Sequence, residues 1–124
     1  MKKIKVLILD DDDELRYNLS LFLEDEGYQT SQSSNCSDAL QHVKQDKFSV
    51  AVVDIRLPGM SGDEFIQLAY KIDPNLKYII HTGSTDFDLS DGLINCGLKA
   101  GDVFRKPIID MIMFTQKINE LLQR

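Results

Sequence analysis

The sequence is poor in cysteine, proline and tryptophan, with two cysteines, three prolines and no tryptophan in 124 residues. Cys36 and Cys96 match neither a CxxC pair nor a metal-site spacing. We expect buried or half-buried free thiols, with a redox or reactive role as the alternative. No apolar run approaches the ~20 residues that cross a bilayer, and residues 1–6 show no signal-peptide pattern. We therefore expect a cytoplasmic protein without a membrane contact.

Basic side chains are outnumbered, since 14 Lys and Arg face 20 Asp and Glu and the net charge is -6. A nucleic-acid-binding surface requires a basic patch, so we expect no direct binding of nucleic acid by this domain. A chain of this length with 43% hydrophobic residues can bury one core. Residues 1–124 are therefore predicted to form a single domain.

Five short apolar or β-branched runs alternate with segments of helical periodicity. The expected strands are residues 4–9, 28–33, 49–53, 77–82 and 102–105, and the weakly apolar run 28–33 is expected near a sheet edge. Alternation of this kind predicts parallel strands joined by right-handed helical crossovers. The expected fold is a doubly wound α/β three-layer sandwich around a five-stranded parallel sheet.

Two of the expected helices differ in quality. Ser61 and Glu64 form a capping-box pattern at the start of the third helix, whose expected apolar face consists of Phe65, Ile66, Leu68, Ala69 and Ile72. The segment 86–97 is weakly periodic and contains Gly92, which costs about 1 kcal/mol relative to alanine inside a helix. We expect this fourth helix to be the least stable.

Polar side chains follow four of the strands. Asp10 and Asp11 follow the first, Asp54 follows the third, Thr82 ends the fourth and Lys106 follows the fifth. The carboxyl ends of parallel strands meet at one edge of the sheet, so these side chains should converge. Three close carboxylates repel one another unless a lysine and a cation balance them. Their hard oxygen ligands suit Mg²⁺.

This set of side chains suits the transfer of a phosphoryl group to a carboxylate. Asp54 would be the nucleophile, and Asp11 and Asp54 would hold Mg²⁺, with Asp10 assisting through water. Lys106 would contact the phosphoryl group and Thr82 would offer it a hydroxyl.

The sequence resembles the receiver domain of a two-component response regulator. The resemblance rests on ILDDD at 8–12 with Arg16, DIRLPGMSG at 54–62, IHTG at 80–83 and Lys106-Pro107. These motifs occur in the family's order and at family-like spacing across nearly the whole chain. The resemblance implies the flavodoxin-like strand order 2-1-3-4-5.

The resemblance also implies a signalling function. A phosphohistidine on a sensor histidine kinase or phosphotransfer protein would phosphorylate Asp54, with Mg²⁺ required and the backbone carbonyl of Arg56 as a further metal ligand. The surface of the fourth helix, fifth strand and fifth helix would then change, to control an effector domain, a partner protein or a homodimer. Such a domain is not an enzyme beyond its own phosphotransfer and slow autodephosphorylation. Whether it is free-standing or part of a longer regulator stays open.

Position 103 departs from the family pattern. Family members usually carry Tyr or Phe three residues before the lysine, and this chain has Val103. Either activation runs through Thr82 and the fourth helix alone, or the neighbouring Phe104 substitutes. Arg56 and Ser84, each two residues past a site residue, are hypothesised to tune the access of water to the acyl phosphate.

Two further sets of residues each have more than one possible role. His81 should point away from the site by strand alternation, which favours packing over catalysis. The apolar Ile109, Ile112 and Met113 either reach under the Lys106-Pro107 loop or form part of a dimer or partner surface.

Two other functions are compatible with a strand that ends in carboxylates. A phosphatase of the haloacid dehalogenase type would use Asp10 and Asp12, although Asp13 and Glu14 do not fit that family's motif and Asp54 would have no role. A flavodoxin-like module that only binds a ligand would need a glycine-rich phosphate loop after the first strand, which the sequence lacks.

Overall fold

The computed structural model describes residues 3–108 and 110–124. Within them the elements follow the order β1 (Lys5–Leu9), α1 (Asp13–Asp25), β2 (Gln29–Ser33), α2 (Cys36–Gln45), β3 (Val50–Val53), α3 (Gly62–Ile72), β4 (Lys77–Thr82), α4 (Asp91–Asn95), a 3₁₀ turn (Ala100–Asp102), β5 (Val103–Arg105) and α5 (Ile112–Leu122). In this part of the chain no helix has the length and apolar character needed to cross a membrane.

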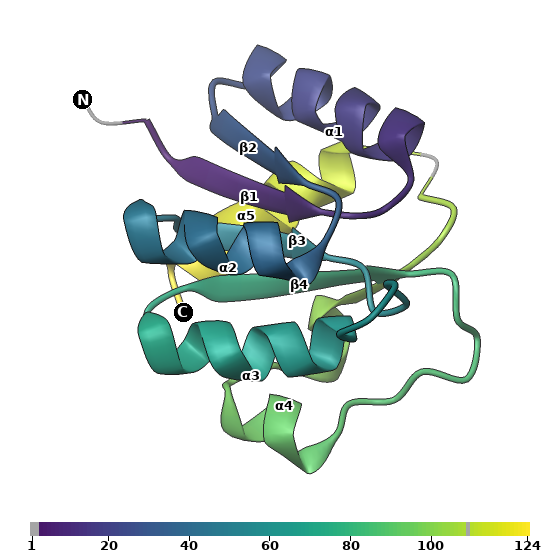
Figure 1. The fold of residues 1–124 in the computed structure, drawn as a ribbon. Coiled ribbons are helices and arrows are strands. Elements are labelled where there is room, and N and C mark those ends of the chain that lie inside the picture. The colour runs from purple at the N-terminus through teal and green to yellow at the C-terminus, as the bar shows by residue number, and fades with distance from the viewer. Residues whose placement is uncertain (1–2, 109) are drawn as a thin grey trace.

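The five strands form one parallel sheet in the order β2-β1-β3-β4-β5. Helices α1 and α5 cover one face of the sheet, and α2, α3 and α4 cover the other (Figure 1). This arrangement confirms the predicted doubly wound sandwich and its strand order. It also confirms that the polar strand β2 lies at an edge.

The core is divided by the sheet into two apolar clusters. Alternation along β3 places Ala51 and Val53 against α2 and α3, whereas Val50 and Val52 face α1 and α5. All four side chains of this strand are buried. A continuous apolar run is therefore the sequence signature of a parallel strand covered on both faces.

Helix α3 begins at the predicted cap, since the Glu64 N–H donates to Ser61 Oγ at 3.2 Å. Its buried face is narrower than predicted, because Leu68 and Ile72 are each 38% exposed. Leu68 lies on the flank of the helical stripe and Ile72 is the last residue of the helix. The prediction that these two side chains face inward is therefore wrong.

Helix α4 is shorter than the predicted segment 86–97 and spans only Asp91–Asn95. It begins at Ser90, whose Oγ accepts from the Leu93 N–H at 3.2 Å, and an extended loop of residues 83–90 precedes it. A Cβ on Gly92 would lie 2.7 Å from the side chain of Gln67 on α3. The glycine that weakens the helical signal thus leaves room for the end of the Gln67 side chain between α4 and α3.

The apolar residues at the start of α5 are only partly described. Ile112 and Met113 are exposed, and Ile109 lies outside the described residues. A dimer or partner surface here remains a prediction. Both cysteines are free thiols, Cys36 buried and Cys96 half-buried, as the sequence indicates.

Candidate functional site

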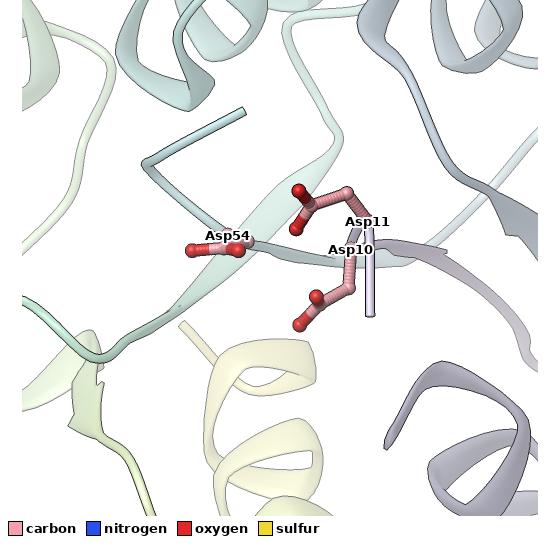
Figure 2. A group of neighbouring side chains, drawn as sticks. All are labelled: Asp10, Asp11 and Asp54. Carbon is pink, nitrogen blue, oxygen red and sulfur yellow. The ribbon is translucent and has the colours of Figure 1, made fainter. Parts of the chain in front are cut away.

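Three carboxylates gather at the carboxyl edge of the sheet. Asp10, Asp11 and Asp54 can each offer one oxygen such that these atoms lie within 4.8 Å of one another (Figure 2). The backbone continues the sheet pairing at this point, since the Asp10 N–H donates to the Ser33 carbonyl at 3.1 Å and the Asp54 N–H to that of Leu9 at 2.9 Å. The sheet itself therefore fixes the acidic pocket, as the sequence predicts.

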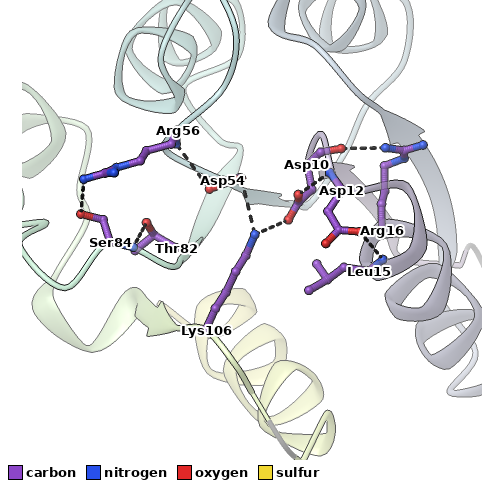
Figure 3. Close-up of polar contacts among 9 residues, drawn as sticks. All are labelled: Asp10, Asp12, Leu15, Arg16, Asp54, Arg56, Thr82, Ser84 and Lys106. Atoms are coloured by element: carbon purple, nitrogen blue, oxygen red, sulfur yellow. Dashed lines mark hydrogen bonds and ion pairs between the residues drawn. The ribbon is translucent and has the colours of Figure 1, made fainter.

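The ammonium group of Lys106 lies between two of these carboxylates (Figure 3). Its Nζ is 2.9 Å from Asp10 Oδ2 and 3.5 Å from Asp54 Oδ2. Burial disfavours its charged form, but the hydrogen bond to Asp10 and the two negative charges outweigh this and raise the pKa of Lys106 above its ordinary value. Lys106 is therefore a permanent cation of the pocket at neutral pH.

The carboxylate of Asp54 is buried, and its surroundings disfavour its charged form. Burial is the main cause that raises its pKa, the charge of Asp10 adds to the shift, and Lys106 opposes it. The Arg56 N–H donates to Asp54 Oδ1 only at 3.4 Å. Three carboxylates thus face one ammonium group, and the pocket has a net attraction for a further cation.

The start of α1 orients Asp10. The Asp12 N–H donates to Asp10 Oδ1 at 2.9 Å, and Arg16 Nη1 donates to the Asp10 carbonyl oxygen at 2.7 Å. Asp12 itself caps the helix, because its Oδ1 accepts from the Leu15 N–H at 3.1 Å. The carboxylate of Asp12 is therefore engaged in holding the helix end (Figure 3).

Thr82 is fully buried at the same edge, but its hydroxyl is turned to the following loop. Its Oγ1 accepts from the Ser84 N–H at 3.1 Å, and Ser84 Oγ in turn accepts from Arg56 Nη2 at 3.2 Å (Figure 3). Among the described residues no hydrogen bond joins the Thr82 hydroxyl to Asp54 or Lys106. Arg56 and Ser84 do lie together at the opening, as predicted, and their effect on water access stays a prediction.

Gly62 is a site residue to which the sequence analysis gave no role. Its N–H donates to the Ile55 carbonyl at 2.9 Å. A Cβ at position 62 would overlap the Asp54 carbonyl oxygen and lie 2.9 Å from Ile55 Cα. Glycine is needed so that the start of α3 can rest directly on the backbone of Asp54. A glycine immediately after a helix cap was the signal for this close approach.

His81 faces away from Thr82 and packs edge-on against Phe114 of α5, with ring centroids 5.1 Å apart. Both ring nitrogens are buried without a hydrogen-bond partner. Burial, assisted by the charge of Lys106, lowers the pKa of His81 to about 4. A packing role agrees with the predicted strand alternation.

The two residues near the departure from the family pattern lie on opposite faces of the sheet. Val103 packs into the cluster beneath α3 and α4, whereas Phe104 belongs to the cluster of α1 and α5. The ring of Phe104 lies 5.2 Å from that of Phe114. Phe104 does not occupy the α4 side of the sheet, so the suggestion that it substitutes for the missing aromatic residue receives no support.

The chain is a doubly wound α/β domain with an acidic site at the carboxyl edge of its sheet. This combination is typical of signalling domains that accept phosphoryl groups. The sequence pattern of the response regulator receiver domain matches residues 6–119, and the chain belongs to this family. It is 35% identical over 89 residues to the sporulation initiation phosphotransferase F of Bacillus subtilis (strain 168). This match covers 72% of each of the two chains.

A solved structure and a longer regulatory protein are also similar to this chain. The crystal structure of a CheY-like response regulator receiver domain protein from Methanospirillum hungatei JF-1 has a TM-score of 0.88 at 30% identity, covering 98% of this chain and 95% of that one. The C4-dicarboxylate transport transcriptional regulatory protein DctD of Rhizobium meliloti (strain 1021) is 32% identical over 102 residues. That match covers 82% of this chain and 22% of the relative.

The family membership makes this chain a two-component signalling domain with phosphoacceptor function. The haloacid dehalogenase alternative finds no support in the comparisons. It also conflicts with the geometry, because that mechanism needs an available carboxylate at Asp12, and this carboxylate caps α1.

Proposed function

We propose that Asp54 is the phosphoacceptor of this receiver domain. The observation that carries the proposal is the position of its carboxylate, which is buried beside two further carboxylates with Lys106 Nζ 3.5 Å away. A carboxylate oxygen of Asp54 would attack the phosphorus of a phosphohistidine. The new P–O bond forms as the P–N bond breaks, and the imidazole leaves with the electron pair of that bond.

Lys106 and Thr82 would stabilise the transferred group. Lys106 already bridges Asp10 and Asp54, so its ammonium group stands next to the place where a phosphoryl group on Asp54 would carry its charge. The Thr82 hydroxyl accepts a hydrogen bond from the Ser84 N–H, and its own proton can be donated to a phosphoryl oxygen after a side-chain rotation.

The donor set fits Mg²⁺. Asp10, Asp11 and Asp54 offer hard carboxylate oxygens, and the backbone carbonyl of Arg56 would complete the protein ligands. The bound ion would supply charge neutralisation for the phosphoryl oxygens. The chain's own part is to hold the three carboxylates on rigid strand ends, so that little reorganisation is needed.

The proposed partners rest on membership of the receiver-domain family. We propose a sensor histidine kinase or a phosphotransfer protein as the phosphodonor, and an effector domain, a partner protein or a second copy as the reader of the α4, β5 and α5 surface. The domain, residues 1–124, would catalyse only its own phosphotransfer and slow autodephosphorylation. The reaction would take place in the cytoplasm, where a kinase draws on ATP.

Phosphorylation by a small donor tests the proposal without a kinase. The purified chain is incubated with acetyl phosphate and Mg²⁺ and its intact mass is followed, with Asp54→Asn and Asp63→Asn as variant and matched control. We expect one hydroxylamine-labile phosphoryl group on the wild type and on Asp63→Asn, and none on Asp54→Asn. An equal adduct on Asp54→Asn would reject the assignment.

A further inference from the structure

Ser84 connects three parts of the site. Its N–H donates to Thr82 Oγ1 at 3.1 Å, its hydroxyl accepts from Arg56 Nη2 at 3.2 Å, and its carbonyl oxygen accepts from Arg105 Nη1 at 2.8 Å. Thr82 and Arg105 are the last residues of β4 and β5, and Arg56 lies in the loop that follows β3. One residue at the start of the loop 83–90 is thus bound to the ends of β4 and β5 and to the loop after β3.

Arg105 holds this loop at a second point. While Nη1 binds the Ser84 carbonyl, Nη2 donates to the carbonyl oxygen of Phe87 at 2.8 Å. The rigid, planar fork of a guanidinium group can hold two acceptors in a fixed relation, which a flexible ammonium group cannot do. Arg105 therefore fixes the path of the loop between Ser84 and Phe87.

The register of the sheet places Arg105 for this role. Thr82 and Arg105 are directly paired residues on β4 and β5, and the Lys106 N–H donates to the Thr82 carbonyl at 2.8 Å. The other end of the loop is tied to α3, because Ser90 Oγ donates to Asp63 Oδ2 at 2.9 Å. Phe87, like Val103, packs against the apolar cluster on the α2 and α3 side of the sheet.

We propose that Arg105 is a positioning residue that holds the loop 83–90 in its resting path and, through Ser84, keeps the Thr82 hydroxyl turned away from Asp54. The Ser84 N–H can bind Thr82 Oγ1 only while the Ser84 backbone stays where Arg105 and Arg56 hold it. A Thr82 hydroxyl that turns towards a phosphoryl group must give up this bond. Part of this inference rests on the proposed roles of Asp54 and Thr82.

Loss of the Arg105 fork should therefore shift the population towards a released loop. A released loop frees the Ser84 N–H from its hydrogen bond to Thr82 Oγ1, so that this amide can exchange, and it frees Thr82 to stabilise phosphoryl transfer. We expect Arg105→Gln to raise amide hydrogen exchange in this loop and to increase the rate of phosphorylation by acetyl phosphate roughly three- to ten-fold. Arg105→Lys keeps the charge but not the fork and should behave like Arg105→Gln.

The test compares the wild type, both Arg105 variants and Lys44→Gln, which removes an exposed positive charge on α2. Hydrogen exchange is measured by mass spectrometry on the unmodified proteins, and phosphorylation rates are measured with acetyl phosphate and Mg²⁺. The expected result is faster exchange confined to residues 83–90 and faster phosphorylation in the Arg105 variants alone. Unfolding midpoints verify that all four proteins are folded.

Three outcomes would overturn the inference. Unchanged exchange in the loop would show that Arg105 does not hold it, and faster exchange throughout the chain would indicate a general loss of stability. Faster loop exchange with an unchanged phosphorylation rate would reject the link to Thr82. A wild type that accepts no phosphoryl group contradicts the proposed function instead, and the exchange measurement still decides whether Arg105 restrains the loop.

Discussion

Lys106 Nζ lies 2.9 Å from Asp10 Oδ2 and so joins residues 96 positions apart in the chain. In the sheet, β3 and β4 separate the strands that these two residues follow. The Lys106 side chain reaches across both strands and passes within 3.5 Å of Asp54 Oδ2. The ion pair thereby connects the end of β1 to the end of β5 across the acidic pocket.

Replacement of this lysine should damage both stability and chemistry. We expect Lys106→Met to lower the free energy of unfolding by about 1–3 kcal/mol in metal-free buffer, because Asp10 and Asp54 lose their shared cation. It should also slow phosphorylation by acetyl phosphate. Urea titration and intact-mass kinetics measure these effects, with Lys44→Met as the control. Two variants of equal stability and equal rate would contradict this role of Lys106.

Removal of the Asp54 charge should have the opposite effect on stability. The folded protein raises the pKa of Asp54, mainly through burial, so the native state binds more protons than the unfolded chain between the two pKa values. Stability therefore falls as the pH rises through that window, and the full penalty is present above it. We expect Asp54→Asn to melt higher than the wild type at pH 7 without metal, and the difference to disappear in acid.

Differential scanning calorimetry from pH 3 to pH 8 measures this pH dependence. Added Mg²⁺ should narrow the difference at pH 7, since binding of the ion stabilises the folded wild type more than the variant. A variant that melts lower than the wild type at pH 7 would show that Asp54 is not an electrostatic burden in the folded state.

Gly62 should not tolerate even one added methyl group. A Cβ there would overlap the Asp54 carbonyl oxygen, so Gly62→Ala must displace either α3 or the backbone of Asp54. We expect a loss of about 1–3 kcal/mol in the free energy of unfolding, as in other overpacked sites. Gly83→Ala is the matched control, because a Cβ there meets only Lys106 Cδ at 4.0 Å. Equal stability of the two variants in urea titrations would refute this account.

His81 should make the protein sensitive to moderate acid. Its pKa is lowered from 6.5 to about 4 by burial, so the unfolded chain binds a proton that the folded protein excludes. Between these two pH values stability is lost as the pH falls, by up to about 3 kcal/mol. His81→Leu should flatten this decline relative to the wild type in denaturant titrations at pH 4 to 7. Parallel curves for the two proteins would argue against a buried neutral imidazole.

The sequence predicts correctly the features that depend on strand periodicity and on the parallel arrangement of the strands. The strand 77–82 has the predicted bounds, and the convergence of Asp10, Asp54 and Lys106 follows from parallel strands that end at one edge. Strand alternation likewise placed His81 on the far side of the sheet. These features depend on the period of the backbone and not on its detailed packing.

The features that sequence reasoning missed depend on the close approach of distant segments. Gly62 is required by the backbone of Asp54, and a Cβ on Gly92 would displace the end of the Gln67 side chain; periodicity reveals neither contact. The loop that takes the place of the first part of the predicted fourth helix is bound by Arg105 and Asp63 through hydrogen bonds. The Thr82 hydroxyl accepts a hydrogen bond from the N–H of Ser84 in this loop, a contact that the sequence pattern does not indicate.

The most direct test of the central claim is the chemical identity of the modified residue. The chain is phosphorylated with acetyl phosphate and Mg²⁺, the acyl phosphate is reduced with borohydride, and peptides are sequenced by mass spectrometry. The account predicts that homoserine replaces aspartate at position 54 and at no other carboxylate. Homoserine at Asp10 or Asp11, or an unmodified peptide around Asp54, would contradict it.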